Sequence, residues 1–259
     1  MIGFERKSEI FNLLEQNGKI AVSSLAEKFG VCKETIRRDL RELEVNNVLK
    51  RTHGGAFIES QTLRNQDEFP VTVREIQRYE EKLAICKKAA SLIKSGDAIF
   101  VDNSSTTIFL VRCIPRNVNV CIITNSLKVL LEAVQLKNPN LRFICLGGEL
   151  KESNMSFSGM IPQKVAQDYY PSKAFLSCAG INEHQMLTDS SAAEVDIKKL
   201  MIDRSQKVFV LADHTKFSST GHVHLTELSS VNCIITDGKT DVTALDYLKK
   251  YDIDLVVVE

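Results

Sequence analysis

The sequence lacks an excess of charge of either sign, because its 259 residues contain 33 Lys or Arg and 33 Asp or Glu. It also has no apolar run near the roughly 18 residues that a membrane helix needs. The first residues lack the apolar core of a secretion signal. We therefore expect a cytoplasmic protein with no membrane partner. A neutral chain also argues, at first, against nucleic-acid binding, whose usual footprint is a basic surface.

Cysteine pairs at the C-x-x-C spacing are absent, and the total of seven cysteines is odd. This argues against a disulfide framework or a zinc ribbon. Cysteines such as Cys121 and Cys145 stand in apolar runs, which indicates small buried side chains in a reducing compartment. The histidines His214, His222 and His224 are irregularly spaced and have no cysteine beside them, so we expect neither a metal nor a cofactor.

The length suits one large or two ordinary domains, since a domain averages roughly 100–200 residues. Hydrophobic residues make up 44% and charged residues 25%, which is typical of globular proteins. The segment 60–68 is polar and weakly patterned, as in an interdomain connector. We predict a small domain over residues 1–58, a linker over 59–75 and a larger domain over 76–259. In the linker, the alternation of Phe69, Val71 and Val73 also allows a short strand.

The first 58 residues carry the periodicity of three short helices followed by two strands around a Gly-Gly turn. A hydroxyl caps the second helix and a glycine ends it. The expected elements are helices over 6–16, from the cap Ser23 to Gly30 and from Cys32 onward, and strands over 48–52 and 56–58. Helix, helix, tight turn, helix and hairpin is the order of a winged helix-turn-helix domain, which reads DNA with its third helix.

The third helix places Ile36, Leu40 and Leu43 on one side and basic residues on the other. Residues 1–57 hold ten Lys or Arg against eight Asp or Glu, so the neutral total hides a slightly basic head. From periodicity alone, a solvated helix with mixed charges remains an equal alternative. The residues expected at DNA are Ser23, Lys33, Glu34, Thr35, Arg37, Arg38, Arg41, Lys50, Arg51, His53, Gly54 and Gly55.

Beyond Tyr79, short apolar strands alternate with amphipathic helices, which predicts an α/β domain with a mostly parallel sheet. The expected strands are 98–101, 118–123, 141–146, 174–179, 208–211, 233–236 and 255–258. The expected helices are 80–94, one through 113, one to 136, one around Val165, 192–202 and 244–251.

Ligands bind at the carboxyl ends of the strands in such sheets. Three loops there combine hydroxyls, backbone N–H groups and glycines, which can cradle a phosphate. For any one loop, simple helix capping is an alternative reading. The loop residues are Asp102, Asn103, Ser104, Ser105, Thr106, Thr107, Thr124, Asn125, Ser126, Gly147 and Gly148.

The motifs KETIRRDL at residues 33–40 and KRTHGGA at residues 50–56 closely resemble the signature of DeoR-type bacterial transcriptional regulators. Cys32 departs from the family's usual Ser at the helix cap, which weakens the cap by about 1 kcal/mol. Asn47 stands where the family often has Gly, and Asn tolerates the left-handed conformation. Neither departure touches the basic face.

The larger domain is similar to the sensor domain of the same family, which resembles ribose-5-phosphate isomerase and coenzyme A transferases in fold. The matching elements are Asp102, residues 105–107, 124–126, 147–150, 158–159 and 180–181, Glu194, Lys198, Met201, Asp213, Lys216 and Phe217. Ser104 stands where the family commonly has Gly. Its side chain would narrow the phosphate cradle or add a hydroxyl donor to it.

The resemblance implies a sugar-phosphate effector. Lys216 is then the expected charge partner, oriented by Asp213, although an exposed salt bridge is the alternative. Glu194 would contact a polyol hydroxyl, or else lie on a solvated helix face.

We therefore expect a repressor of a sugar operon that binds operator DNA as a homo-oligomer and responds to a phosphorylated sugar. One alternative is an enzyme, an isomerase or acyl transferase with an attached head, in which Glu194, Asp213 and Lys216 move protons. Another is a sensor whose head binds a protein. Fold similarity alone carries no function, so the enzyme is the weaker interpretation.

Overall fold

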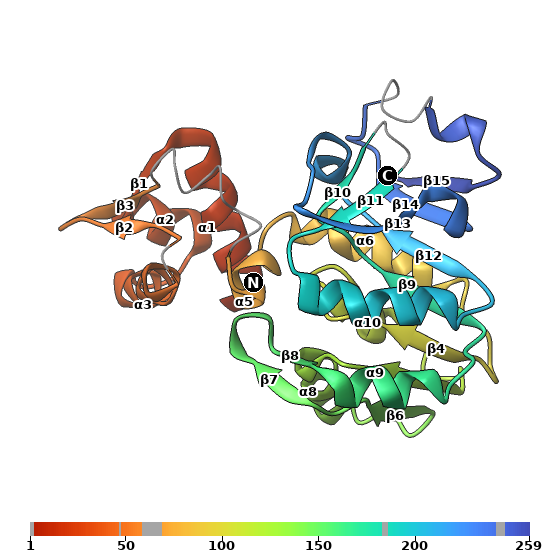
Figure 1. The fold of residues 1–259 in the computed structure, drawn as a ribbon. Helices are drawn as coiled ribbons and strands as arrows, with labels where there is room; N and C mark the ends of the chain where they lie inside the picture. The colour runs from red at the N-terminus through yellow and green to blue at the C-terminus, as the bar shows by residue number, and fades with distance from the viewer. Residues whose placement is uncertain (1–2, 47, 59–68, 183–185, 242–246) are drawn as a thin grey trace. The chain divides into compact units, whose positions relative to one another are not determined.

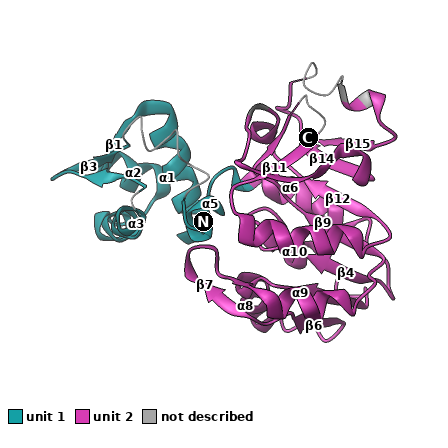
Figure 2. Cartoon of the chain, in the orientation of Figure 1, with its two compact units in different colours: residues 1–79 teal, residues 80–259 magenta. Residues whose placement is uncertain are grey.

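A computed structural model describes residues 3–46, 48–58, 69–182, 186–241 and 247–259. The chain divides into two compact units, Met1–Tyr79 and Glu80–Glu259 (Figure 2). Within the described residues, the helices are all too short or too polar to cross a membrane.

The first unit contains several short helices and a three-stranded antiparallel sheet (Figure 1). Its elements are α1 (Gly3–Asn17), β1 (Lys19–Ala21), α2 (Val22–Phe29), α3 (Lys33–Val45), β2 (Lys50–Arg51), β3 (Gly55–Phe57) and α5 (Val71–Arg74). The apolar residues of the helices and of β3 meet in one core, in which Ile10, Leu25 and Ile36 are fully buried. The winged helix-turn-helix prediction is confirmed, and β1 is an additional strand that pairs with β3.

The second helix begins two residues earlier than predicted. Its cap is Ala21, whose side chain makes no capping bond, and Ser23 lies inside the first turn with its side chain exposed. The capping role predicted for Ser23 is therefore wrong, because β1 runs directly into the helix. At the other end, Gly30 adopts the left-handed conformation (φ +63°), as the glycine stop predicts.

The C-terminal part of the predicted linker belongs to the first unit. Val71–Arg74 is a short helix, so the strand that the alternation allowed is not formed. Val73 and Ile76 are buried in the core of residues 1–79, and the second unit accordingly begins at Glu80, not at residue 76. The predicted linker residues 59–68 and the turn residue Asn47 lie outside the described residues.

The second unit is built on a seven-stranded parallel sheet in the order β15-β14-β12-β9-β4-β5-β6. The strands are β4 (Ala98–Val101), β5 (Val120–Thr124), β6 (Leu141–Cys145), β9 (Lys173–Leu176), β12 (Val208–Leu211), β14 (Cys233–Asp237) and β15 (Asp254–Val258). The central strands are buried along their length, which is why they read as apolar runs without alternation. All seven predicted strands are found, within one or two residues at most ends.

Helices and two small antiparallel sheets surround this sheet. The helices are α6 (Tyr79–Ala90), α7 (Leu110–Cys113), α8 (Leu127–Leu136), α9 (Met160–Gln167) and α10 (Ala192–Asp203). Of these, α9 and α10 pack side by side (Figure 1). One small sheet pairs β7 (Glu149–Lys151) with β8 (Ser156–Ser158), and the other joins β10 (Gly180–Ile181), β11 (Met186–Asp189) and β13 (Val223–Glu227). The helix predicted over 244–251 is a 3-10 turn at Tyr247–Lys250 within the described part.

Candidate functional site

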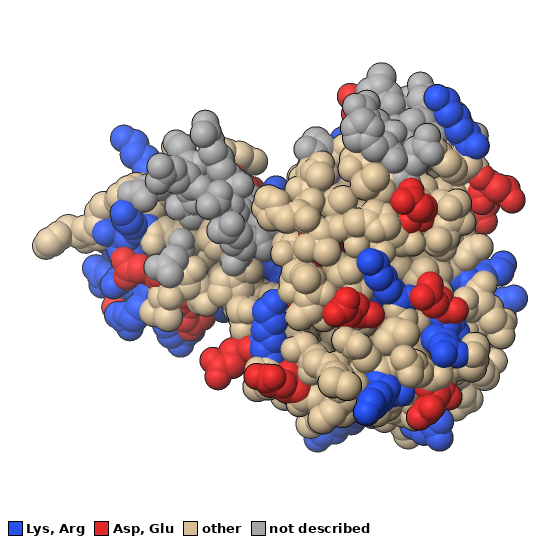
Figure 3. All heavy atoms as spheres, viewed as in Figure 1, with Lys and Arg blue, Asp and Glu red and all other residues tan. Residues whose placement is uncertain are grey.

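The third helix of the first unit presents a mixed but cation-rich face. Lys33, Arg37, Arg38 and Arg41 are exposed, whereas Ile36, Leu40 and Leu43 are buried. Asp39 is also buried, because it pairs with Arg6 of α1 at 2.6 Å (Nε to Oδ2). Thus α3 loses one acidic side chain from its outer surface, and the face gains in positive charge. Figure 3 shows the basic side chains of this region gathered together with a few acidic ones.

The arginines of this face differ in their partners. Glu34 lies 3.4 Å from Arg37 (Oε2 to Nη1) and 4.0 Å from Arg41. Arg38 and Lys33 have no hydrogen-bond or ion-pair partner within the part of the chain that the structure describes. Exposed ion pairs contribute little to stability, so DNA phosphates can replace Glu34 as the partner of its arginines.

The wing offers Arg51 and His53 at exposed positions, with Lys50 beside them. Arg51 pairs with Glu44 of α3 at 2.5 Å, and hydrogen bonds from Arg51 lower the pKa of the Glu44 carboxyl. This pair ties the wing to the helix. Gly54 is exposed and has open space around it, as a DNA contact requires.

Gly55 has a structural reason to be glycine. It is buried in the pairing of β3 with β1, and a Cβ there would stand 2.1 Å from the backbone oxygen of Ile20. The close approach of the two strands therefore requires glycine at this position, and a DNA contact through Gly55 loses its support.

The second unit has a topological switch point between β4 and β9. From β4 the chain adds β5 and β6 on one side, and from β9 it adds β12, β14 and β15 on the other. Loops leave the two neighbouring strands in opposite directions at their carboxyl ends, which opens a ligand-sized crevice in folds of this type. Asp102 follows β4 and Ser177 follows β9, so both stand at this point.

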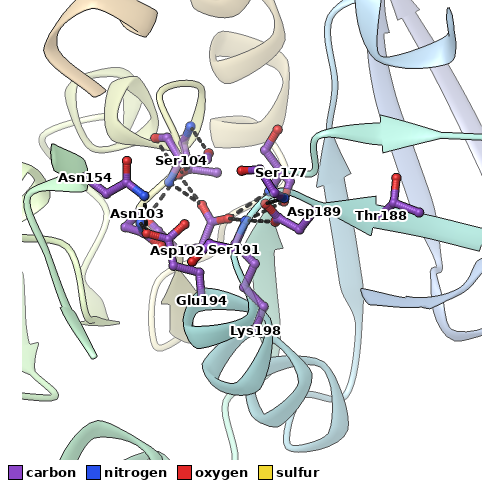
Figure 4. A network of polar contacts seen from close by, with 12 residues as sticks. Asp102, Asn103, Ser104, Asn154, Ser177, Thr188, Asp189, Ser191, Glu194 and Lys198 are labelled. Atoms are coloured by element: carbon purple, nitrogen blue, oxygen red, sulfur yellow. Dashed lines mark hydrogen bonds and ion pairs between the residues drawn. The ribbon is translucent and has the colours of Figure 1, made fainter. Parts of the chain in front are cut away.

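A buried ion network occupies the switch point (Figure 4). The ammonium of Lys198 lies 2.6 Å from Asp189 Oδ2 and 3.1 Å from Asp102 Oδ2, and it donates to the Ser177 carbonyl at 2.9 Å. Asp102 also accepts from the backbone N–H groups of Ser177 and Ser104. The network thus joins the ends of β4, β9 and β11 to α10.

Burial by itself would lower the pKa of the Lys198 ammonium. The carboxylates of Asp189, Asp102 and Glu194 outweigh burial, so this pKa lies above its ordinary value. Lys198 is therefore charged at any physiological pH. With three carboxylates around one lysine, the four side chains leave this part of the site acidic.

Glu194 is the second hub of the site and is only 4% exposed. Its Oε1 atom accepts hydrogen bonds from Asn103 (3.0 Å), from Ser156 (3.4 Å) and from Asn154. The solvated-face alternative for Glu194 is thus wrong. The three donors come from the β4 loop and from the β7–β8 hairpin, so Glu194 draws these segments onto α10.

The loop after β4 folds back on itself. Ser104 Oγ accepts from the Thr107 backbone N–H at 3.1 Å, and Lys82 donates to Ser105 Oγ at 3.1 Å. The Ser104 hydroxyl is therefore engaged within the loop. The backbone N–H groups of Ser105 and Thr106 meet no acceptor within the described residues, so they are available to an anion.

The loop after β5 lies beside this one. Ser126 caps α8 by accepting from the Val129 N–H at 3.3 Å, as the capping alternative predicted for this residue. Thr124 Oγ1 accepts from the Ser126 N–H, and Asn125 pairs with Phe157 of β8 through its backbone and its amide. These three residues therefore have structural partners of their own.

The glycines after β6 shape a turn. Gly147 and Gly148 both have positive φ, and a Cβ on Gly148 would meet the Ser158 carbonyl at 2.6 Å and Pro162 at 2.7 Å. This packing explains Gly148 without a ligand.

On the other side of the switch point, Asp213 caps a 3-10 turn that carries Lys216, by accepting from the Thr215 N–H at 3.1 Å. Burial raises the pKa of the Cys178 thiol to about 12, and Lys216, Asp189, Lys198 and Asp213 are the charges that act on it. The Asp213 turn packs against β10, and β10 pairs with β11, the strand that carries Asp189. His214 and His224 bond different carboxylates, Asp237 and Glu227.

The site includes several residues that the sequence reasoning did not place in it, namely Lys82, Asn154, Ser156, Ser177, Asp189 and Lys198. One signal could have found Lys198, because Glu194 and Lys198 stand one turn apart among the apolar residues of a helix. Asp189 and Ser156 have no such signal, since only the folded hairpins bring them to the sheet edge.

A helix-turn-helix unit with an exposed basic third helix, joined to an α/β unit with a polar site at its switch point, defines a DNA-binding transcriptional regulator with a sensor domain. Comparison with known proteins agrees. Residues 6–62 match the DeoR-like helix-turn-helix domain, and residues 77–238 match the DeoR C-terminal sensor domain. The chain belongs to the DeoR family of transcriptional regulators.

Two relatives and one solved structure illustrate the comparison. The HTH-type transcriptional regulator YulB of Bacillus subtilis is 35% identical over 100% of this chain and 98% of its own length. The glycerol-3-phosphate regulon repressor of Escherichia coli is 30% identical over 97% of each chain. The ribose-5-phosphate isomerase A of Methanocaldococcus jannaschii matches 54% of this chain and 55% of its own at 19% identity with a TM-score of 0.40, which is too distant to carry an argument.

Proposed function

We propose that this protein represses an operon of sugar or carbohydrate metabolism, and that a phosphorylated sugar bound in residues 80–259 controls its affinity for operator DNA. The observation that carries the proposal is the buried polar network at the switch point of the sheet. Its position is the one where sheets of this kind bind ligands. The E. coli relative, which is named for a regulon of a phosphorylated polyol, supports the chemical class.

In this proposal the phosphate binds at the loop after β4. The backbone N–H groups of Ser105 and Thr106, which meet no acceptor among the described residues, donate to its oxygens. Lys216 supplies a positive charge, because Lys198 is already neutralised by two aspartates. The sugar hydroxyls face the acidic part of the site around Glu194. No further cofactor is needed.

The head binds operator DNA through α3 in the major groove. Arg37, Arg38 and Arg41 contact phosphates or base edges, and Arg51 and His53 of the wing contact the backbone. A single head of this size makes few contacts, so we also propose a homo-oligomer that reads paired half-sites in the cytoplasm.

Catalysis is not part of the proposal. Of the residues to which the enzyme alternative assigns proton transfer, Glu194 accepts three hydrogen bonds within the chain, and Asp213 caps the turn that carries Lys216. Both carboxylates therefore have structural roles. Turnover of pentose or hexose phosphates by the purified protein would contradict this.

The test is a thermal-shift screen of sugar phosphates on the full chain, followed by DNA-binding titrations with the ligands that bind. A ligand of the native state raises the melting temperature by mass action, by several degrees at 100 times its dissociation constant. We expect at least one sugar phosphate to stabilise the protein and to change its operator affinity. Silence across pentose, hexose and polyol phosphates would overturn the sensor proposal and leave the DNA-binding role intact.

A further inference from the structure

Two buried amide oxygens in the loops after β4 and β5 have no hydrogen-bond partner among the residues that the structure describes. They are Oδ1 of Asn103, whose residue is 2% exposed, and Oδ1 of Asn125, whose residue is 1% exposed. Buried polar atoms in folded proteins are nearly always paired, so each exception calls for a partner that the chain itself does not supply.

The orientation of both amides is determined by their other atom. Asn103 Nδ2 donates to the Glu194 carboxylate at 3.0 Å, and Asn125 Nδ2 donates to the Phe157 carbonyl at 3.2 Å. Reversing either amide would place its oxygen against another acceptor oxygen, that of the Glu194 carboxylate or of the Phe157 carbonyl. The unpaired atoms are therefore acceptors, and their missing partners must be hydrogen-bond donors.

The chain connects the two acceptors to one site. Asn103 stands between Asp102 of the ion network and Ser105 and Thr106, whose backbone N–H groups meet no acceptor among the described residues. Asn125 bonds Phe157, which follows Ser156, and Ser156 donates to the same Glu194 oxygen as Asn103. Acceptors at this place, in acidic surroundings, favour a neutral O–H donor over a second phosphate group.

We propose that Asn103 Oδ1 accepts a hydrogen bond from a hydroxyl group of the effector, with Asn125 as a second acceptor, so that Asn103 determines specificity for a hydroxylated sugar phosphate. This inference rests on the proposed function and adds to it the residue that reads the sugar. The phosphate is held elsewhere, at the loop of residues 104–107. Loss of Asn103 should therefore affect the sugar and spare the phosphate.

The experiment is calorimetric titration of the full-length protein and of Asn103→Ala with the sugar phosphates that bind the wild type. The probes are ribose 5-phosphate, glucose 6-phosphate and fructose 1-phosphate, each also with inorganic phosphate as a competitor. We expect Asn103→Ala to weaken the sugar phosphate at least 10-fold and to change the inhibition by inorganic phosphate less than 2-fold. A site that reads a hydroxyl discriminates strongly, because an unmatched acceptor stays buried.

Two further variants serve as controls. Asn182→Ala removes another amide whose oxygen has no partner among the described residues, on the β10–β11 hairpin, and this variant should bind sugar phosphates as the wild type does. Asn103→Ser replaces Asn103 with a smaller polar side chain, which keeps the test possible if the alanine variant does not fold.

Each other outcome contradicts the inference in a distinguishable way. Wild-type affinity in Asn103→Ala would mean that water alone fills the acceptor. An equal loss for inorganic phosphate would mean that Asn103 only supports the loop. A wild type that binds none of the sugar phosphates would overturn the proposed function, and this inference with it.

Discussion

Arg38 is the arginine of α3 that no acidic side chain holds. Arg37 and Arg41 share Glu34, and Arg51 of the wing pairs with Glu44, whereas Arg38 is exposed without a partner within the described residues. A contact from Arg38 to DNA breaks no existing pair. Removing the Arg38 side chain should therefore weaken DNA binding by the whole free energy of its contact.

We expect Arg38→Ala to weaken operator binding by about 1–3 kcal/mol per protomer, with an unchanged melting temperature. Fluorescence anisotropy with operator DNA at several salt concentrations measures it. If the contact is to phosphate, the salt dependence also falls by about one counterion. The control is Lys94→Ala, an exposed cation of the second unit, which should bind as the wild type does. Wild-type operator affinity in the Arg38→Ala protein would contradict the proposal that α3 binds the operator through this arginine.

Gly54 and Gly55 stand next to each other and should respond oppositely to alanine. At Gly55 a Cβ would lie 2.1 Å from a backbone oxygen, whereas at Gly54 nothing lies within 4 Å. We expect Gly55→Ala to lower the free energy of unfolding of the first unit by about 3 kcal/mol, and Gly54→Ala by under about 0.5 kcal/mol. Chemical denaturation followed by circular dichroism measures both, and similar values for the two would refute the close approach of β3 to β1.

At the scale of elements, α10 carries both hubs of the candidate site. Glu194 and Lys198 lie on its buried side, beside Val195, Ile197 and Met201. Each is balanced by partners from other elements, so the helix is held by polar as well as apolar contacts. A buried ion network of this kind is weak as net stabilisation but costly to break.

We expect Lys198→Met to lower the free energy of unfolding by about 3–5 kcal/mol, because Asp102 and Asp189 would remain buried and unpaired. Lys199→Met, at the next and exposed position, should cost under about 0.5 kcal/mol. The difference in free energy of unfolding between Lys198→Met and the wild type should shrink as pH falls from 8 to 5. Protonation of the unpaired aspartates removes their buried negative charge. Denaturant titrations at several pH values measure it, and a deficit that grows toward low pH would contradict the network.

In the wild type, the stability that Lys198 contributes depends on pH at the alkaline end of the scale. Because the pKa of Lys198 lies above its ordinary value, the stability from its ion pairs is fully present below about pH 10 and is lost only as pH rises beyond it.

The sequence predicted some strands of the fold and missed others. The strands of the parallel sheet are continuous apolar runs such as Val208–Leu211, and their neighbours along the chain sufficed to predict them. The strands β1, β7, β8, β10, β11 and β13 escaped prediction, because most have only two to four residues, and β1 and β13 pair with strands that lie far away in the sequence. The site residues Asp189 and Ser156 come from these missed strands.

At the scale of the whole molecule, two separate units must influence each other if the proposed function holds. Binding linkage then requires reciprocity. If a sugar phosphate lowers operator affinity by a given factor, operator DNA must lower the affinity for that sugar phosphate by the same factor, typically about 5- to 150-fold.

Calorimetric titration of the sugar phosphate into the protein with and without operator DNA measures one factor, and anisotropy measures the other. We expect the two to agree within error. A sugar phosphate could instead bind tightly without changing the affinity for operator DNA, and with its own affinity unchanged by the DNA. That result would show that ligand binding in the second unit does not control DNA binding by the first.

The sequence by itself determined the class of the protein, the two-unit plan, the basic face of α3 and the loops at the sheet's carboxyl edge. These features depend on local periodicity and on motifs, which neighbouring residues along the chain encode. Only the tertiary structure decided that Gly55 is a packing residue, that Glu194 is buried and that Lys198 lies between Asp102 and Asp189. Such roles arise from contacts between residues up to 96 positions apart in the chain, and burial makes each contact strong by excluding water.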